Sequence, residues 1–211
     1  MTRTAVIIPC LNEEESIQKV VRGFRKSLPD AEIYVFDNGS SDETIRRAIE
    51  CGAIVRTVEE RGKGNVVRRA FADVDSEVYI LVDGDNTYDP ATANEMVNLV
   101  VGTGVDLVTA SRVPSVESVR ARRGHNLGNT SISRLVRFLF RSDTEDVLSG
   151  YRALSRRFVK SFPATASGFE IEVQMTAHAS LLRVRNQSIP SAYRERENGG
   201  SKLKTIRDGT R

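Results

Sequence analysis

Two acidic residues separated by a single glycine, Asp83 and Asp85, follow an apolar run at 79–82. Such a run of bulky residues predicts a buried strand, so both carboxylates lie where that strand leaves its sheet. Gly84 keeps the backbone between them unobstructed. Unpaired neighbouring carboxylates repel each other, whereas Mg²⁺ or Mn²⁺ takes oxygen ligands from one or two carboxylates together with substrate phosphates. The pattern predicts a metal-bound diphosphate; a plain turn, for which Asp-Gly-Asp-Asn is also suited, is the alternative.

Polar residues also follow the other predicted strands. Strands are predicted at 5–8, 33–36, 53–55, 79–82 and 106–109, with helices through 13–28, 45–49 and 62–74 and from Pro90 onward. This alternation favours a mostly parallel sheet covered on both faces, whose ligands bind at the carboxyl ends of the strands. The residues that follow the five strands are Asn12 and Glu13, Asp37 and Asn38, Arg61 and Lys63, Asp83 and Asp85, and Ser111 and Arg112. Their convergence predicts a phosphate- and metal-binding cleft.

The second half of the chain is less regular. Residues 113–123 predict a loop rich in Ser and Arg, and residues 169–182 predict a helix. The stretch 127–140 is amphipathic and flanked by arginines. It is suited either to a membrane interface with anionic lipid or to a core helix with a solvated basic side.

Length and composition bound the class of protein. The chain has 211 residues, of which 39% are hydrophobic and 28% charged, as expected for one folded α/β domain. Basic residues cluster at 112–141 and 183–211 and favour an anionic partner such as phosphate, lipid or nucleic acid; a solvated basic face with no partner is the alternative. Cys10 and Cys51 give no disulfide framework, so a reducing compartment is expected. We find no secretory leader and no apolar window of about 20 residues that would cross a bilayer.

Taken together, several turns resemble the motifs of a known family. Residues 6–14, 37–44, 83–85 and 110–112 are similar to inverting family 2 glycosyltransferases of the GT-A fold. Residues 146–152 and 193–203 resemble the polyprenyl-phosphate sugar transferases, which include dolichol-phosphate mannose synthase and the bacterial undecaprenyl-phosphate glucosyltransferases. The resemblance implies an α/β GT-A (nucleotide-diphospho-sugar transferase) fold, with a mostly parallel central sheet flanked by helices, over residues 1–192. Residues 193–211 would be an acceptor-side arm, which in this branch commonly leads into transmembrane helices.

The same resemblance implies a role for each matching residue. The resemblance implies that Asp83, Asp85 and Arg112 are catalytic. It also implies that Asp85 and Thr87 bind the Mg²⁺ or Mn²⁺ ion. The nucleotide of the donor would be bound by Pro9, Leu11, Asn12, Glu13, Asp37, Asn38, Lys63, Asp83 and Gly84. Donor or acceptor phosphate would be bound by Ser111, Arg112, Arg123, Ser149, Arg196, Ser201 and Lys202.

Three positions depart from the family pattern. Leu11 stands where an aromatic residue is common, Asn38 replaces an aspartate, and Thr87 replaces a glutamine that supports the metal. The identity of the base and the set of metal ligands therefore stay open.

The expected reaction transfers a hexose, with inversion, from a GDP- or UDP-linked sugar to a dolichyl or undecaprenyl phosphate. A phosphate monoester has a second pKa of about 6 and is mostly dianionic at neutral pH, so it attacks without a strong base. A soluble hydroxyl or saccharide acceptor would need a carboxylate to take its proton, and Asp146 or Glu172 would serve. For Glu172, an exposed helical position without a role is the alternative.

A third interpretation is a non-catalytic module that binds nucleotide sugar or nucleic acid, but no aromatic stacking platform accompanies the arginines. The expected partners are a nucleotide-sugar donor, a polyprenyl-phosphate acceptor and a membrane surface, and not nucleic acid. A membrane partner protein or a homo-oligomer is left open. We expect a cytoplasmic protein, peripheral at the cytoplasmic face of the membrane.

Overall fold

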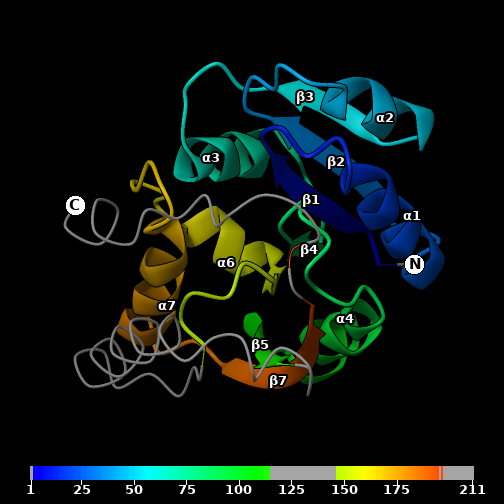
Figure 1. Ribbon diagram of the computed structural model, residues 1–211. Helices are drawn as coiled ribbons and strands as arrows, with labels where there is room; N and C mark the ends of the chain where they lie inside the picture. The colour runs from blue at the N-terminus through cyan, green and yellow to red at the C-terminus, as the bar shows by residue number, and fades with distance from the viewer. Residues whose placement is uncertain (1, 115–145, 195, 197–211) are drawn as a thin grey trace.

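The computed structural model describes residues 2–114, 146–194 and 196, which build a sheet of seven strands flanked by helices (Figure 1). The strands are β1 (Thr4–Cys10), β2 (Glu32–Asp37), β3 (Ile54–Thr57), β4 (Val78–Leu81), β5 (Leu107–Pro114), β6 (Arg152–Ser155) and β7 (Asn186–Tyr193). The helices are α1 (Ile17–Ser27), α2 (Thr44–Glu50), α3 (Lys63–Asp73), α4 (Thr92–Thr103), α6 (Arg156–Ser161) and α7 (Ile171–Leu181).

The sheet has the order β3-β2-β1-β4-β6-β5-β7. Within it, β1 pairs in parallel with β2 and β4, β2 with β3, and β5 with β7. Only β6 among the described strands is antiparallel to its neighbours, β4 and β5. The predicted mostly parallel α/β sheet is therefore confirmed.

Helices cover both faces of the sheet because successive side chains of a strand point to opposite sides. Val6 and Ile8 of β1 pack into a core with α1, α2 and α4. Ala5 and Ile7 of the same strand pack into a second core with α3, α6 and α7. Figure 1 shows α3, α6 and α7 on one side of the sheet and α1 and α4 on the other.

The end of the sheet at β5 and β7 differs from the sequence prediction. Ser111 and Arg112 were expected in a turn after the fifth strand, but they lie within β5. This strand continues to Pro114 because β7 pairs with it along its whole length. The sequence did not predict β7, whose residues Asn186 and Pro190 have low strand propensity. As the last strand in the described sheet order, β7 tolerates a proline because an edge strand need not donate every backbone hydrogen bond.

A close approach of backbones fixes the start of α3 against the loop that leads to α7. The N–H of Gly64 donates to the carbonyl of Ser167 over 2.9 Å. A Cβ at Gly64 would lie 2.1 Å from the carbonyl oxygen of Ala166, so only glycine fits there. This contact places Lys63, the first residue of α3, close to the first turn of α7.

Among the described helices, none combines the length and the apolar composition needed to cross a bilayer. The amphipathic helix predicted at 127–140 lies outside the described residues, as does most of the loop predicted at 113–123.

Replacing Gly64 with alanine is expected to lower the free energy of unfolding by about 1–3 kcal/mol, because the added methyl group overlaps backbone atoms. Gly102→Ala in α4 is the matched control, since a Cβ there meets no atom within 4 Å. Helix propensity predicts that this control gains up to about 1 kcal/mol. Urea denaturation followed by circular dichroism measures both variants. Equal stabilisation by the two alanines would contradict the close approach of α3 to the 164–168 loop.

Candidate active site

The turns after β1 and β2 are locked together by hydrogen bonds. The backbone N–H of Asn12 donates to Ser40 Oγ, and that of Ser41 donates to Asn12 Oδ1, each over 2.8 Å. The backbone N–H of Glu13 donates to Thr44 Oγ1 over 2.8 Å. The predicted nucleotide-binding residues of the first turn therefore lie at a fixed position beside the second turn.

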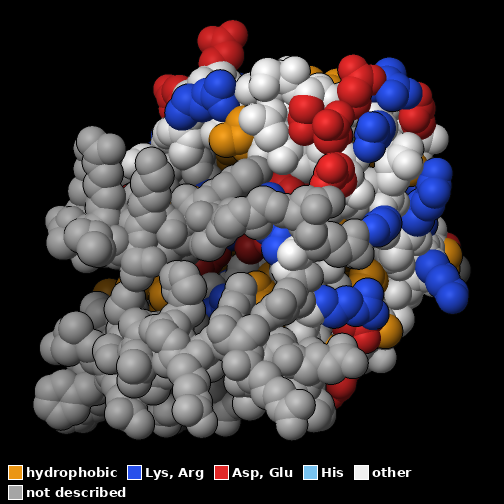
Figure 2. All heavy atoms as spheres, viewed as in Figure 1, with side chains coloured by type: hydrophobic (Ala, Val, Ile, Leu, Met, Phe, Trp, Pro, Cys, Tyr) orange, Lys and Arg blue, Asp and Glu red, His pale blue; other side chains and the backbone are white. Residues whose placement is uncertain are grey.

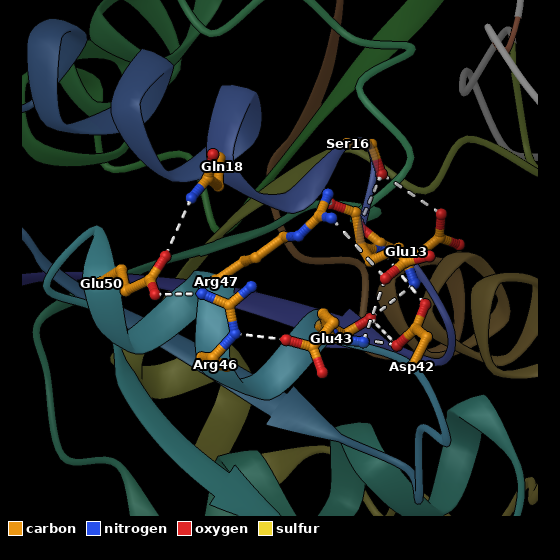
Figure 3. A network of polar contacts seen from close by, with 10 residues as sticks. Glu13, Ser16, Gln18, Asp42, Glu43, Arg46, Arg47 and Glu50 are labelled. Atoms are coloured by element: carbon orange, nitrogen blue, oxygen red, sulfur yellow. Dashed lines mark hydrogen bonds and ion pairs between the residues drawn. The ribbon is translucent and has the colours of Figure 1, made fainter.

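Ser16 connects this junction to the acidic loop after β4. Its Oγ donates to the carbonyl of Gly84 over 2.7 Å and lies 3.3 Å from Glu13 Oε2. Figure 3 shows Ser16 and Glu13 facing each other, and Asp42 accepts the backbone N–H of Glu14 over 3.2 Å. Pro9 and Leu11, the other predicted residues of the first turn, are half-buried.

Asp37 and Asn38 at the end of β2 use their side chains to shape the turns. Asp37 is buried, and its Oδ2 accepts the N–H groups of Gly39 and Ser40, each over 2.9 Å. The Asn38 amide donates to two carbonyls of the 58–60 segment and accepts the N–H of Gly62. Asn38 thereby holds the loop that ends at Lys63. Direct contacts of these two residues with a nucleotide stay predictions.

Asp83 lies between a cation and a glycine. Its Oδ1 accepts a hydrogen bond from Lys63 Nζ at 2.5 Å, and its side chain is 31% exposed. On the other side, a Cβ at Gly150 would lie 2.1 Å from Asp83 Oδ2. Lys63 therefore holds one oxygen of this carboxylate and the Gly150 backbone lies close to the other, while the exposed part remains accessible to a ligand.

Lys63 also pairs with Glu172 of α7, whose Oε1 lies 2.5 Å from the same Nζ. Burial would lower the pKa of Lys63, but the charges of Asp83 and Glu172 outweigh it and raise that pKa. The ammonium group therefore stays charged between two carboxylates. Glu172 is 2% exposed, so the alternative of an exposed helical carboxylate is wrong.

Asp85 is held by Thr87, the residue predicted to bind the metal together with it. Both the N–H and the hydroxyl of Thr87 donate to Asp85 Oδ1, over 3.2 and 2.7 Å. Burial and then the charge of Asp83 raise the pKa of Asp85, while the hydrogen bond from Thr87 acts against them. This geometry makes Thr87 a support for Asp85. No group of three or more His, Cys, Asp or Glu side chains that would hold a metal occurs in the described part of the chain.

Arg112 in β5 forms a bidentate ion pair with Asp146. Its Nε and Nη2 lie 2.6 and 2.7 Å from the two carboxylate oxygens. The guanidinium also lies over the ring of Tyr193, 5.5 Å from its centroid. Tyr193 forms an isolated antiparallel β-bridge with Tyr88, which lies three positions after Asp85. The predicted phosphate-binding arginine and the acidic loop are thus joined through the end of β7.

Arg196, predicted to bind phosphate, contacts the first turn. Its Nη2 donates to both carboxylate oxygens of Glu13, over 2.5 and 2.6 Å. Ser111 is buried, and its hydroxyl has no hydrogen-bond partner in the described structure. Ser149 is buried, and its Oγ donates to the carbonyl of Ala110 over 2.6 Å. Three further predicted residues lie outside the described part of the chain, namely Arg123, Ser201 and Lys202.

The match to a family decides the class of this site, since residues 5–162 fit the model for glycosyl transferase family 2. The chain belongs to this family. This glycosyltransferase is 33% identical over 206 residues to "Glycosyltransferase AglJ" of Haloferax volcanii, covering 97% of this chain and 67% of the relative. It is 48% identical over 121 residues to "Protein RfbJ" of Shigella flexneri, covering 57% of this chain and 94% of that protein.

Polyprenyl-phosphate enzymes are also among the relatives. The glycosyltransferase is 25% identical over 213 residues to a dolichol-phosphate mannosyltransferase of Pyrococcus furiosus, covering 96% of this chain and 59% of the length of that enzyme. The predicted family resemblance is thereby confirmed.

A solved structure shows the same fold. Glucosyl-3-phosphoglycerate synthase from Mycobacterium tuberculosis, in complex with Mn²⁺, uridine diphosphate and phosphoglyceric acid, matches with a TM-score of 0.77 at 25% identity. The match covers 94% of this chain and 72% of that chain. The predictions of a GT-A fold and of a hexosyltransferase are confirmed.

Two features of the glycosyltransferase site were not predicted from the sequence. Tyr88 is buried, and its hydroxyl accepts the N–H of Gly150 over 2.9 Å, which fixes the glycine that abuts Asp83. The bridge from Glu172 to Lys63 joins residues 109 positions apart. Neither pairing leaves a local pattern in the sequence.

Gly150→Ala is expected to lower the free energy of unfolding of the glycosyltransferase by about 1–3 kcal/mol, because its methyl group would overlap Asp83 Oδ2. The cost should fall in an Asp83→Ala background, where the overlapping carboxylate is absent. A double-mutant cycle in urea measures this coupling. Equal costs in both backgrounds would show that Gly150 does not contact Asp83.

Proposed function

We propose that this enzyme transfers a hexose from a nucleoside diphosphate sugar to a polyprenyl phosphate, with inversion at the anomeric carbon. An oxygen of the lipid phosphate forms the new bond to C1 of the sugar from the face opposite the donor's diphosphate. The bond from C1 to the diphosphate breaks, and its electron pair leaves with the nucleoside diphosphate. Atoms and charge balance without any proton transfer.

The main support for this proposal is that Asp146 and Glu172, the two candidate bases for a hydroxyl acceptor, are both engaged in ion pairs. Asp146 is held by two nitrogens of the Arg112 guanidinium, and Glu172 is held by Lys63. Each carboxylate would have to give up its ion pair before it could accept a proton from a hydroxyl group. A phosphate dianion needs no such base. The dolichol-phosphate mannosyltransferase among the relatives gives further support.

The residues of the acidic loop fit a divalent cation. Asp85 lies close enough to Asp83 and Glu13 for their charges to disfavour its ionised form, and a cation would relieve that repulsion. Asp85 would hold the ion, with Thr87 orienting its carboxylate. Mg²⁺ and Mn²⁺ commonly bind through one or two carboxylates plus substrate phosphates, so a larger protein ligand set is not required. When bound, the ion supplies positive charge that stabilises the departing diphosphate.

Arg112 would supply further positive charge. It is anchored by Asp146 and Tyr193, so its guanidinium is fixed before a phosphate binds. Donors held in advance near developing charge stabilise it without the cost of reorganisation. Arg196 would add to this charge from the segment after β7.

A soluble acceptor is the second candidate. It is favoured by the similarity to glucosyl-3-phosphoglycerate synthase, whose structure contains phosphoglyceric acid. In that case a hydroxyl group would replace the lipid phosphate, and Asp146 or Glu172 would have to leave its ion pair to accept the proton.

A polyprenyl acceptor would bring the enzyme to a membrane surface, and we propose the cytoplasmic face. Cys10 and Cys51 form no disulfide in the described structure, which fits a reducing compartment. Figure 2 shows acidic and basic side chains interspersed over α1 and α2, where Arg46 pairs with Glu43 and Glu50. The mixed charge over these two helices does not favour nucleic acid there.

Purified enzyme is expected to form lipid-linked sugar from a short-chain polyprenyl phosphate, with Mn²⁺ or Mg²⁺ and at least one of UDP-glucose, UDP-N-acetylglucosamine and GDP-mannose. Asp85→Ala should abolish the product, and Arg112→Ala should reduce it by about 10²–10³-fold through lost charge stabilisation. Arg46→Ala, which removes an exposed ion pair on α2, is the control and should change turnover by less than about twofold. Chromatography of radiolabelled lipid measures the product.

Sugar transfer to a hydroxyl compound such as phosphoglyceric acid, with none to lipid phosphate, would overturn the lipid proposal and favour the second candidate. Nucleotide-sugar binding without transfer to either acceptor class would contradict both.

Thr87→Ala is expected to weaken the activation of the enzyme by Mn²⁺ by about 10–100-fold, because Asp85 loses the hydroxyl that orients it. Thr87→Ser keeps this hydroxyl and should stay close to the wild type. The Mn²⁺ concentration at half-maximal donor turnover measures the effect. Equal values for the alanine and serine variants would exclude the hydroxyl as a support for the metal ligand.

A further inference from the structure

Three charged side chains from distant elements form a buried row behind the acidic loop. Lys63 opens α3, Asp83 follows β4, and Glu172 lies in the first turn of α7. Lys63 Nζ is 2.5 Å from Asp83 Oδ1 and 2.5 Å from Glu172 Oε1. The side chains of Glu172 and Lys63 are 3% and 7% exposed, against 31% for Asp83. Asp83 is therefore the member of the row that a ligand reaches.

The position of Asp83 depends on how firmly Lys63 is held. A lysine side chain has a flexible four-carbon stem and acts as a point charge, so a single partner leaves it several orientations. Glu172 supplies a second, buried partner on the opposite side of the ammonium group. Gly150 limits the other oxygen of Asp83. The carboxylate is thus confined between Lys63 and the Gly150 backbone.

Stability alone is a poor explanation for Glu172. A buried ion pair gains little over an apolar replacement, because removing both charges from water costs about as much as their attraction returns. Neighbours on α7 show that the same face accepts apolar side chains, since Ile171 and Met175 pack into the core beside it. The charge of Glu172 acts on the buried Arg152 as well as on Lys63, but only Lys63 connects Glu172 directly to Asp83.

We infer that Glu172 is a positioning residue for donor binding, which acts through Lys63 to hold the Asp83 carboxylate in place for a hydroxyl group of the nucleotide sugar. This inference rests on the proposed use of a nucleotide-sugar donor, and for a hydroxyl acceptor it leaves Asp146 as the base. It assigns Glu172 no proton transfer. It also separates Glu172 from Asp85, which serves the diphosphate.

The test is donor binding by isothermal titration with Mn²⁺ present, using whichever of UDP-glucose, UDP-N-acetylglucosamine and GDP-mannose binds most tightly. Glu172→Gln keeps the shape of the side chain and removes its charge. It should weaken donor binding about tenfold, as loss of a residue that orients a ligand-binding group commonly does. Donor KM should rise by a similar factor with kcat changed less, which is the pattern of lost uniform binding.

Glu170→Gln, in the same turn, is the matched control. Glu170 Oε1 accepts the N–H groups of Ser167 and Gly168, and a glutamine oxygen can accept both. This control should bind donor within about twofold of the wild type.

A double-mutant cycle with Asp83→Asn separates positioning from general stability. If Glu172 acts through Asp83, Glu172→Gln should change donor binding by less than about twofold in the Asp83→Asn background. A tenfold loss in both backgrounds, or no loss in the wild-type background, would overturn the inference. Binding of none of the three donors by the wild type would overturn the proposed function itself, and with it the inference.

Discussion

Repulsion between carboxylates gathered at one edge of the sheet is the constraint on which this site depends. Parallel strands end at a common edge, and here that edge brings Asp83, Asp85 and Glu13 close together. Charges taken out of water need partners, or their burial destabilises the fold. The chain supplies those partners from other elements, with Lys63 beside Asp83 and Arg196 beside Glu13. Asp85 accepts a hydrogen bond from Thr87, and the charge of Arg196 offsets part of the repulsion from Asp83.

These ion pairs also determine how the elements meet. Lys63 holds the start of α3 to the end of β4 and to α7, while Arg112 holds β5 to the segment before β6. Glycines at 64 and 150 make the first of these contacts feasible, because a side chain at either position would overlap a neighbour. The charged side chains at this edge of the sheet are therefore fixed by the same contacts that pack the helices. Preorganisation of this kind supports electrostatic catalysis, since little reorganisation is left for the reaction step.

Much of the framework could be predicted from the sequence. The buried strands β1, β2 and β4 are short apolar runs, and the stripe of Ile17, Val20, Val21 and Phe24 on α1 has helical spacing. The predicted turns after these strands lie where the rule for open α/β sheets places them. The prediction failed where pairing with a distant segment decides the structure. The strand β7 exists because β5 lies beside it, and Arg112 is within a strand for the same reason.

The sequence by itself determined which residues leave the ends of the strands, and hence the chemistry available at the edge: carboxylates, a lysine and an arginine. Only the tertiary structure decided how they are paired. From the sequence, Glu172 was interpreted as an exposed helical carboxylate or as a base. In the structure it is buried against a lysine 109 positions away. Hydrophobic periodicity is a local signal set by neighbours along the chain. An ion pair depends on the distance between two side chains in space, which is fixed only when helices and strands pack together.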